Sequence, residues 1–185
     1  RTTICIFCGS NEGSMLQYKY GAYALAQALA ERGAGIVYGG GSRGLMGEIA
    51  RAALDNCAPL TGIVPGRFRS DRLSPPLGAE YRFVDTMQER KQLMRDLSEG
   101  FAVLPGGIGT IDEIVETLML KSLGFHDKPL AVLDIGGYFR HFFEFLDDST
   151  RAGFMKPSLL NEIFIDEDPA AIANFLLSSI EQRNR

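Results

Sequence analysis

The sequence has no apolar run that approaches the roughly 20 residues a helix needs to cross a bilayer. It also has no excess of basic residues, because 23 aspartates and glutamates outnumber 19 lysines and arginines, for a formal net charge of −4. We therefore expect neither a membrane nor a nucleic acid as partner. A small anionic ligand is still compatible with this balance, because local backbone dipoles bind anions without a basic surface.

Cysteine and histidine are too few and too scattered to predict a metal site. The two histidines, His126 and His141, have no ligand spacing. Cys5 and Cys8 have CxxC spacing but lie in a strand-like run, where positions i and i+3 point to opposite faces. This geometry disfavours chelation and a disulfide, and it predicts buried thiols in a reducing cytoplasm. We recognise no signal peptide, and a chain that begins with Arg1 instead of Met is expected to lack a few native residues.

Short apolar runs alternate with helical patterns along the chain, without an internal repeat, a low-complexity tract or a linker. Such alternation predicts an α/β protein, a Rossmann-like doubly wound parallel sheet with helices on both faces. A length of 185 residues predicts a single domain, residues 1–185. The expected strands are 3–8, 36–38, 60–64, 81–84, 101–104, 130–133 and 162–165, and the expected helices are 15–32, 45–54, 87–99, 109–123, 138–149 and 169–180, with 66–80 irregular and basic.

Glycine clusters interrupt the chain where strands of this sheet would end, which is where ligands bind in open α/β sheets. The first is Gly9-Ser10, and the most pronounced is Pro105 to Thr110, with the sequence PGGIGT. Its three glycines would let an anion reach the free N–H groups at the start of a helix, and its threonine adds a hydroxyl. The alternative is a tight strand-to-helix turn that merely needs glycine.

A further glycine cluster, YGGGSRGLMG, spans Tyr38 to Gly47. Gly39, Gly41 and Gly44 fit the dinucleotide pattern G-x-G-x-x-G, but they follow the second strand instead of the first. Alone, this pattern is a weak sign of a nicotinamide cofactor. The cluster nevertheless stands at the end of a strand, as PGGIGT does. Two glycine clusters at equivalent strand ends favour ligand binding over the alternative that PGGIGT is only a tight turn.

Helical spacing places Thr110, Glu113 and Thr117 on one face, with Asp112 about 100° away from that face. Glu113 lies about one turn beyond Thr110, so a phosphate bound at Thr110 would have the carboxylate next to it on the same face of the helix. The alternative is that Glu113 only complements the helix dipole.

An arginine falls on an apolar stripe in the segment MQERKQLMRDLSE, where Arg90 lies between Met87 and Met94 at helical spacing. An arginine that faces inward needs a partner, and Glu113 or a phosphate would serve. The alternative is an arginine whose stem covers apolar surface while its charge stays in water. Lys91 stands beside it.

Together the motifs FCGS, VYGGGSRGLMG, MQERK and PGGIGTIDE resemble the LOG family, the cytokinin-activating nucleoside 5′-monophosphate phosphoribohydrolases that are often mislabelled lysine decarboxylases. The family signature PGGxGTxxE is complete here. The resemblance implies Arg90 and Glu113 as the catalytic pair. It implies the following substrate-binding residues: Gly39, Gly40, Gly41, Ser42, Gly44, Met46, Gly47, Met87, Lys91, Pro105, Gly106, Gly107, Gly109 and Thr110.

The resemblance implies hydrolysis of the N-glycosidic bond of a purine nucleoside 5′-monophosphate, such as AMP or isopentenyladenosine monophosphate, to a free base and ribose 5-phosphate. It implies no cofactor and no metal. One alternative is a non-catalytic nucleotide-binding or sensor module on the same fold, which would need neither Arg90 nor Glu113. Another is a pyridoxal-dependent decarboxylase, which requires a Schiff-base lysine, and of five lysines only Lys91 lies in a motif.

The resemblance also implies a homodimer. The expected helix over 87–99 carries Met87, Met94 and Leu97 on one side and Leu93 on another, more apolar surface than one sheet face needs. We therefore expect this helix near a two-fold interface. The alternative is that Leu93 contacts the irregular segment.

Overall fold

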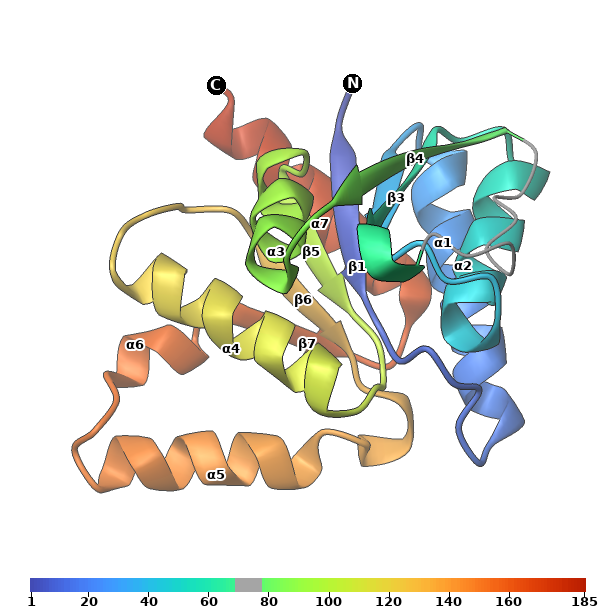
Figure 1. Ribbon diagram of the computed structural model, residues 1–185. Coiled ribbons are helices and arrows are strands. Elements are labelled where there is room, and N and C mark those ends of the chain that lie inside the picture. The colour runs from blue at the N-terminus through green and yellow to red at the C-terminus, as the bar shows by residue number, and fades with distance from the viewer. Residues whose placement is uncertain (69–77) are drawn as a thin grey trace.

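The computed structural model describes residues 1–68 and 78–185, and it shows a central sheet between two layers of helices (Figure 1). Seven parallel strands follow the order β4-β3-β2-β1-β5-β6-β7, which confirms the predicted α/β class. The strands are β1 (Thr3–Phe7), β2 (Gly35–Tyr38), β3 (Leu60–Pro65), β4 (Ala79–Val84), β5 (Gly100–Val103), β6 (Leu130–Leu133) and β7 (Ile163–Asp166).

The helices are α1 (Leu16–Glu31), α2 (Gly44–Asp55), α3 (Met87–Asp96), α4 (Ile108–Ser122), α5 (Arg140–Arg151), α6 (Pro157–Leu160) and α7 (Pro169–Arg183), with short 3₁₀ turns η1 (Gly66–Phe68) and η2 (Ile135–Gly137). In the described ranges, no helix combines the length and apolar character that a membrane crossing requires.

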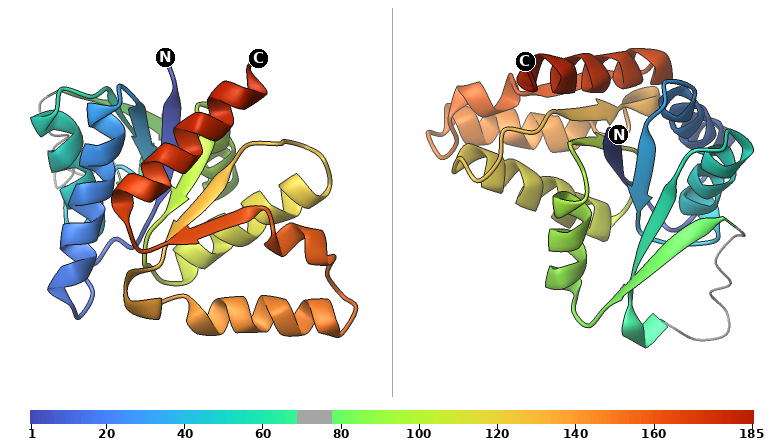
Figure 2. Two further views of the ribbon diagram at one scale, coloured as in Figure 1. Left: turned by 180° about the vertical axis from the view of Figure 1, so that it is seen from behind. Right: turned by 90° about the horizontal axis from the view of Figure 1, so that it is seen from above.

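Burial on both faces of the central strands explains why these segments read as continuous apolar runs. Helices α1, α2 and α7 pack on one face, and α3, α4 and α5 pack on the other (Figure 2). Cys5 and Cys8 belong to the two opposite cores and both are buried free thiols, as the strand geometry predicts. Cys57, the third thiol, is exposed.

Three sequence predictions about elements were wrong. The segment 66–80 was expected to be irregular throughout, but Gly66–Phe68 form η1 and β4 already begins at Ala79; the part of this prediction that falls on residues 69–77 lies outside the described residues. Helix α6 was not foreseen, since its four residues carry too little periodicity to detect. Helix α5 begins at Arg140 and not at Tyr138, because Phe139, with φ −89° and ψ 6°, departs from helical geometry and forms the N-cap.

The strand order reverses at the centre of the sheet, and this reversal positions the site. From β1 the chain steps outward through β2, β3 and β4, then returns to place β5 on the other side of β1. The loops after β1 and β5 therefore diverge from adjacent strand ends and leave a crevice between them. They are joined at its base, where the Gly9 N–H donates to the Pro105 carbonyl at 3.0 Å.

Candidate active site

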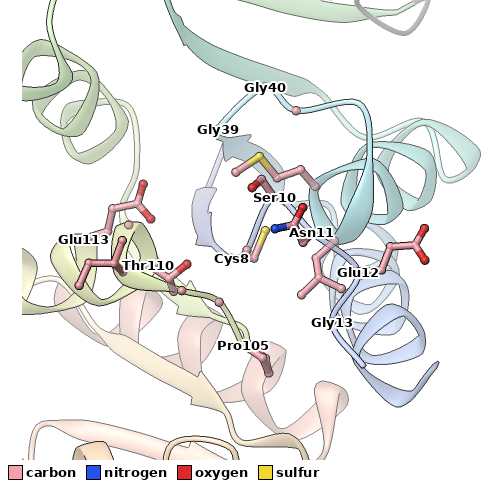
Figure 3. A pocket seen from close by; sticks show the side chains of 18 of the residues that line it. Cys8, Ser10, Asn11, Glu12, Gly13, Gly39, Gly40, Pro105, Thr110 and Glu113 are labelled. Atoms are coloured by element: carbon pink, nitrogen blue, oxygen red, sulfur yellow. The ribbon is translucent and has the colours of Figure 1, made fainter. Parts of the chain in front are cut away.

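A cavity of about 870 Å³ opens at this reversal, within the size range of small-molecule sites. Figure 3 shows Glu113 and Thr110 on one side of it, across from Asn11 and Glu12 on the other. Most of the predicted site residues line this cavity: Gly39, Gly40, Gly41, Met46, Met87, Arg90, Pro105, Gly106, Gly107, Gly109, Thr110 and Glu113.

Arg90 faces inward, so the interpretation of a solvated arginine was wrong. Helix α3 begins at a capping box, in which Thr86 and Glu89 satisfy each other's backbone N–H groups. Arg90 follows in the first turn and is only 8% exposed. Its guanidinium donates to the Ile63 carbonyl at 3.0 Å, to the Gly39 carbonyl at 3.2 Å and to Glu113 Oε1 at 3.4 Å. Arg90 therefore links the ends of β2 and β3 to α4.

Glu113 is buried on the face of α4 that also carries Thr110 and Thr117, as its spacing predicts. Burial raises the pKa of Glu113 to about 7, although the Arg90 guanidinium opposes this shift. Asp112, the adjacent carboxylate, is exposed and instead pairs with Lys91 at 2.9 Å. A carboxylate that only complements the helix dipole would remain in water, so the burial of Glu113 points to a different role.

The glycines of PGGIGT have two different physical explanations. A Cβ on Gly106 would lie 2.0 Å from Thr110 Oγ1 and 2.7 Å from the Gly9 nitrogen, so tight packing requires this glycine. A Cβ on Gly107 or Gly109 would meet no atom within 4 Å among the described residues. Gly107 is also the N-cap of α4 and supplies no side-chain cap. Packing thus accounts for one glycine, and the other two leave the first turn of α4 open to an anion.

The second glycine loop is held by close contacts. A Cβ on Gly39 would lie 2.2 Å from Arg90 Nη2, so the arginine can reach the loop only because residue 39 is glycine. Gly40 has a φ of +78°, and its carbonyl accepts a hydrogen bond of 2.7 Å from the Tyr81 hydroxyl. Tyr38 lies 3.2 Å from that hydroxyl. The loop is therefore fixed from β2 and β4 together.

Four residues predicted to bind substrate do not line the cavity. Lys91 Nζ pairs with Asp112 at 2.9 Å and with Glu116 at 2.7 Å on the outside of α4. Ser42 borders a neighbouring depression, which shares Ser10 and Gly41 with the cavity. Gly44 and Gly47 are instead packing positions, because a Cβ there would lie 2.3 Å from the Ser10 carbonyl oxygen and 2.8 Å from the Ser42 carbonyl oxygen, respectively.

The structure adds lining residues that the site prediction did not include: Cys8, Gly9, Ser10, Asn11, Glu12, Gly13, Tyr18, Leu45, Val64, Pro65, Phe68, Ile108 and Tyr138. The Gly9-Ser10 break at the end of the first strand was a usable signal for the β1 loop. Val64 and Phe68 had no such signal, because only the strand order brings their loops to this edge of the sheet. Tyr138 lies in the segment IGGYF, which also resembles the LOG family, but it was not assigned to the site.

The lining counts against a Schiff base. Among the described residues that border the cavity there is no lysine, so a Schiff base has no donor there, and Lys91 is held by two carboxylates. In the same described ranges, no group of three or more histidine, cysteine, aspartate or glutamate side chains could hold a metal ion.

The comparison with curated sequences identifies the relatives. A family model described as "Possible lysine decarboxylase" matches residues 46–176. A probable cytokinin riboside 5′-monophosphate phosphoribohydrolase of Oryza sativa subsp. japonica is 38% identical over 182 residues, which span 98% of this chain and 80% of that protein. A cytokinin riboside 5′-monophosphate phosphoribohydrolase of Arabidopsis thaliana is 36% identical over 179 residues, with coverage of 97% and 81%.

Solved structures share the fold at much lower identity. The molybdenum cofactor binding protein from Rippkaea orientalis superposes with a TM-score of 0.74 at 19% identity, over 98% of both chains. The Moco carrier protein from Chlamydomonas reinhardtii gives 0.70 at 19% identity, over 99% of both chains. At these identities the likeness concerns the fold alone. The family match and the closer sequence relatives show that this chain belongs to the LOG family, that of the cytokinin riboside 5′-monophosphate phosphoribohydrolases.

Proposed function

We propose that this protein hydrolyses the N-glycosidic bond of purine nucleoside 5′-monophosphates, such as AMP or isopentenyladenosine monophosphate, to the free base and ribose 5-phosphate. The names of its relatives support this activity. The observation that carries the proposal is the buried Arg90–Glu113 pair, one helical turn from an open, glycine-lined helix start. A protein that only binds nucleotides would need the glycine loops but not a buried carboxyl group with a raised pKa.

The phosphate would bind at the first turn of α4, at Gly107, Gly109 and Thr110. Glu113 lies three residues beyond Thr110, about 4.5 Å further along the axis, which suits a ribose attached to that phosphate. Cleavage of the glycosidic bond develops positive charge on the ribose, as in other glycoside hydrolyses. Ionised Glu113 would stabilise that charge and orient or activate the attacking water, and a pKa near 7 suits a general base at neutral pH.

Arg90 would hold Glu113 ionised and fixed. Two of its hydrogen bonds go to backbone carbonyls, at Ile63 and Gly39, so its position does not depend on Glu113 alone. Its charge favours the carboxylate form and thereby limits the rise in the pKa of Glu113 that burial causes. Because the same guanidinium borders the cavity, it can also contact the sugar or the phosphate.

The base would lie against the apolar wall of the cavity. This wall combines Met46 from α2, Val64 and Pro65 from β3, Phe68 from η1 and Met87 from α3. Thioether and aromatic side chains provide contacts that suit a flat purine, and methionine adapts to irregular shapes. The segment 39–47, which carries Met46, would cover the nucleotide on the same side of the cavity as this wall.

The direct test of this function is the release of base from a panel of purine 5′-monophosphates, separated by chromatography. We expect adenine and ribose 5-phosphate in equal amounts from AMP, without added metal or cofactor. Binding of AMP without base release from any member of the panel would instead indicate the nucleotide sensor. The order of rates across the panel would give the base preference.

We also propose that the protein works as a homodimer. Four residues motivated an interface at α3. Leu93, Met94 and Leu97 pack against the chain's own core, so most of that reason was wrong, while Met87 is exposed and lines the cavity. Several exposed apolar residues gather on α4 and its C-cap, at Ile108, Val115, Met119 and Leu123. Their spacing places them along one face of the helix, and Ile108 also borders the cavity. A two-fold contact along this face of α4 would bury these four apolar side chains and shield the cavity from water.

The dimer predicts a particle of about twice 20.3 kDa in light scattering at micromolar concentration. Met119→Glu should reduce the mass to that of one chain, because a carboxylate would have to be buried against its own copy. Tyr20→Glu, at an exposed position on α1, is the matched control and should leave the mass unchanged. A fully active wild-type particle of 20.3 kDa would contradict the proposal.

A further inference from the structure

Tyr138 stands at the border of the cavity in a segment that the proposed reaction does not otherwise use. It follows Gly136 and Gly137, whose φ values of +61° and +68° turn the chain between η2 and α5. Strands β5 and β6 pair in register, with Val103 opposite Val132, so the loops that follow them run side by side. Tyr138 is 43% exposed and lines the cavity beside the PGGIGT segment.

The contacts of Tyr138 fix its ring and direct its hydroxyl at the PGGIGT segment. Its ring lies edge-on to Tyr18 at 5.7 Å and to the buried Phe139 at 5.0 Å between centroids. The Phe139 N–H donates to Asp134 Oδ1 at 2.9 Å, which anchors the chain immediately after Tyr138. The Tyr138 hydroxyl donates to the Gly106 carbonyl. A fixed ring thus holds a hydrogen bond to the backbone of the segment.

Two successive carbonyls of this segment are held from outside it. Pro105 accepts from the Gly9 N–H at 3.0 Å, and Gly106 accepts from Tyr138. In a planar trans peptide the carbonyl and the following N–H point in opposite directions. Hydrogen bonds at these carbonyls therefore turn the N–H groups of Gly106 and Gly107 away from the β1 loop and from Tyr138. Successive N–H groups oriented together form a concave site for an anion.

We propose that Tyr138 is a positioning residue, which orients the Gly106–Gly107 peptide so that its N–H is ready to bind the 5′-phosphate. This inference rests on the proposed function, since it assumes a phosphate at the start of α4. Gly107 has no side chain, so it can contact the phosphate only through its backbone N–H. The Tyr138 hydroxyl fixes the Gly106 carbonyl and, because the peptide is planar, also the direction of the Gly107 N–H. The contacts of the ring with Tyr18 and Phe139 hold the hydroxyl in place.

The test compares Tyr138→Phe with Tyr23→Phe. Both variants keep the ring and remove one hydroxyl that makes a hydrogen bond, but the Tyr23 hydroxyl bonds Asp55 at 3.0 Å, outside the cavity lining. Calorimetry would measure the affinity for AMP and for adenosine, beside the melting temperature and the KM and kcat for AMP. We expect Tyr138→Phe to weaken AMP binding and raise KM about five-fold, as loss of one neutral hydrogen bond implies, with adenosine affinity unchanged. Tyr23→Phe should change neither affinity.

The outcomes separate this inference from the reaction itself. Equal weakening of AMP and adenosine by Tyr138→Phe, or no change in either, would overturn the positioning role, whatever happens to the melting temperature. If the wild-type protein binds AMP but releases no base, the proposed reaction fails, while the same two affinities still decide the role of Tyr138. If the wild-type protein binds AMP no better than adenosine, the positioning role of Tyr138 fails, while base release from AMP still decides the proposed reaction.

Discussion

Glu113→Gln should lower the rate of base release from AMP by more than about 100-fold, the usual effect of removing one electrostatic stabiliser of a transition state. The amide keeps the shape of the carboxylate but carries no charge to oppose the cation that develops on the ribose. Affinity for AMP should persist, because the phosphate would be held by the backbone of the PGGIGT segment. Single-turnover kinetics and calorimetry would separate the two effects.

Asp112→Asn is the matched control for this substitution. It makes the same chemical change one residue away, at an exposed carboxylate that pairs with Lys91 outside the cavity lining. We expect the Asn variant to retain most of the wild-type rate. Near-normal base release by the Gln variant would remove Glu113 from the mechanism, even if the family signature is complete.

The pH dependence gives a second measurement on the same residue. Burial raises the pKa of Glu113 to about 7, so its ionised fraction falls as the pH drops through that value. If ionised Glu113 is required, kcat/KM should decrease on the acid side of about pH 7, and this limb should be absent from the residual activity of Glu113→Gln. A wild-type limb near the ordinary glutamate pKa would mean that the carboxyl group is better solvated during turnover than its burial indicates.

Local chemistry explains why much of the site was predictable from sequence. A glycine run between an apolar strand and a helix has few physical explanations, and helical spacing alone placed Glu113 and Thr110 on one face. Arg90 was predictable for a related reason: an arginine on an apolar stripe needs a partner, and an acidic candidate stood in the neighbouring motif. In each case the signal was a short stretch of sequence that can be interpreted without knowledge of the strand order.

The remaining parts of the site depend on contacts between distant elements, which no local pattern encodes. The family resemblance implied Lys91 as a substrate-binding residue. Adjacent helical residues point about 100° apart, however, so Lys91 does not share the direction of Arg90 and pairs with α4 carboxylates instead. Phe68 and Tyr138 border the cavity only because the strand order brings their loops together. A sequence gives the ends of strands more readily than their order.

The 5′-phosphate should decide whether a nucleotide is cleaved at all. We expect kcat/KM for AMP to exceed that for adenosine by at least about 1000-fold, the equivalent of two hydrogen bonds to a charged group at about 2 kcal/mol each. Binding energy from this remote group would hold the ribose against Glu113 and so contribute at the reacting bond. Comparable turnover of the two compounds would contradict the phosphate role assigned to Gly107, Gly109 and Thr110.

Gly109→Ala tests the same point from the protein side. A methyl group at residue 109 meets no atom within 4 Å among the described residues, and alanine favours a helix, so the fold should be at least as stable. The methyl group would nevertheless stand where the phosphate must approach the backbone. We therefore expect turnover of AMP to fall at least about ten-fold, a loss of some 1.4 kcal/mol, while the slow turnover of adenosine stays unchanged. An Ala variant that keeps the full preference for AMP would show that the phosphate binds elsewhere, because steric exclusion at this position requires the anion to be there.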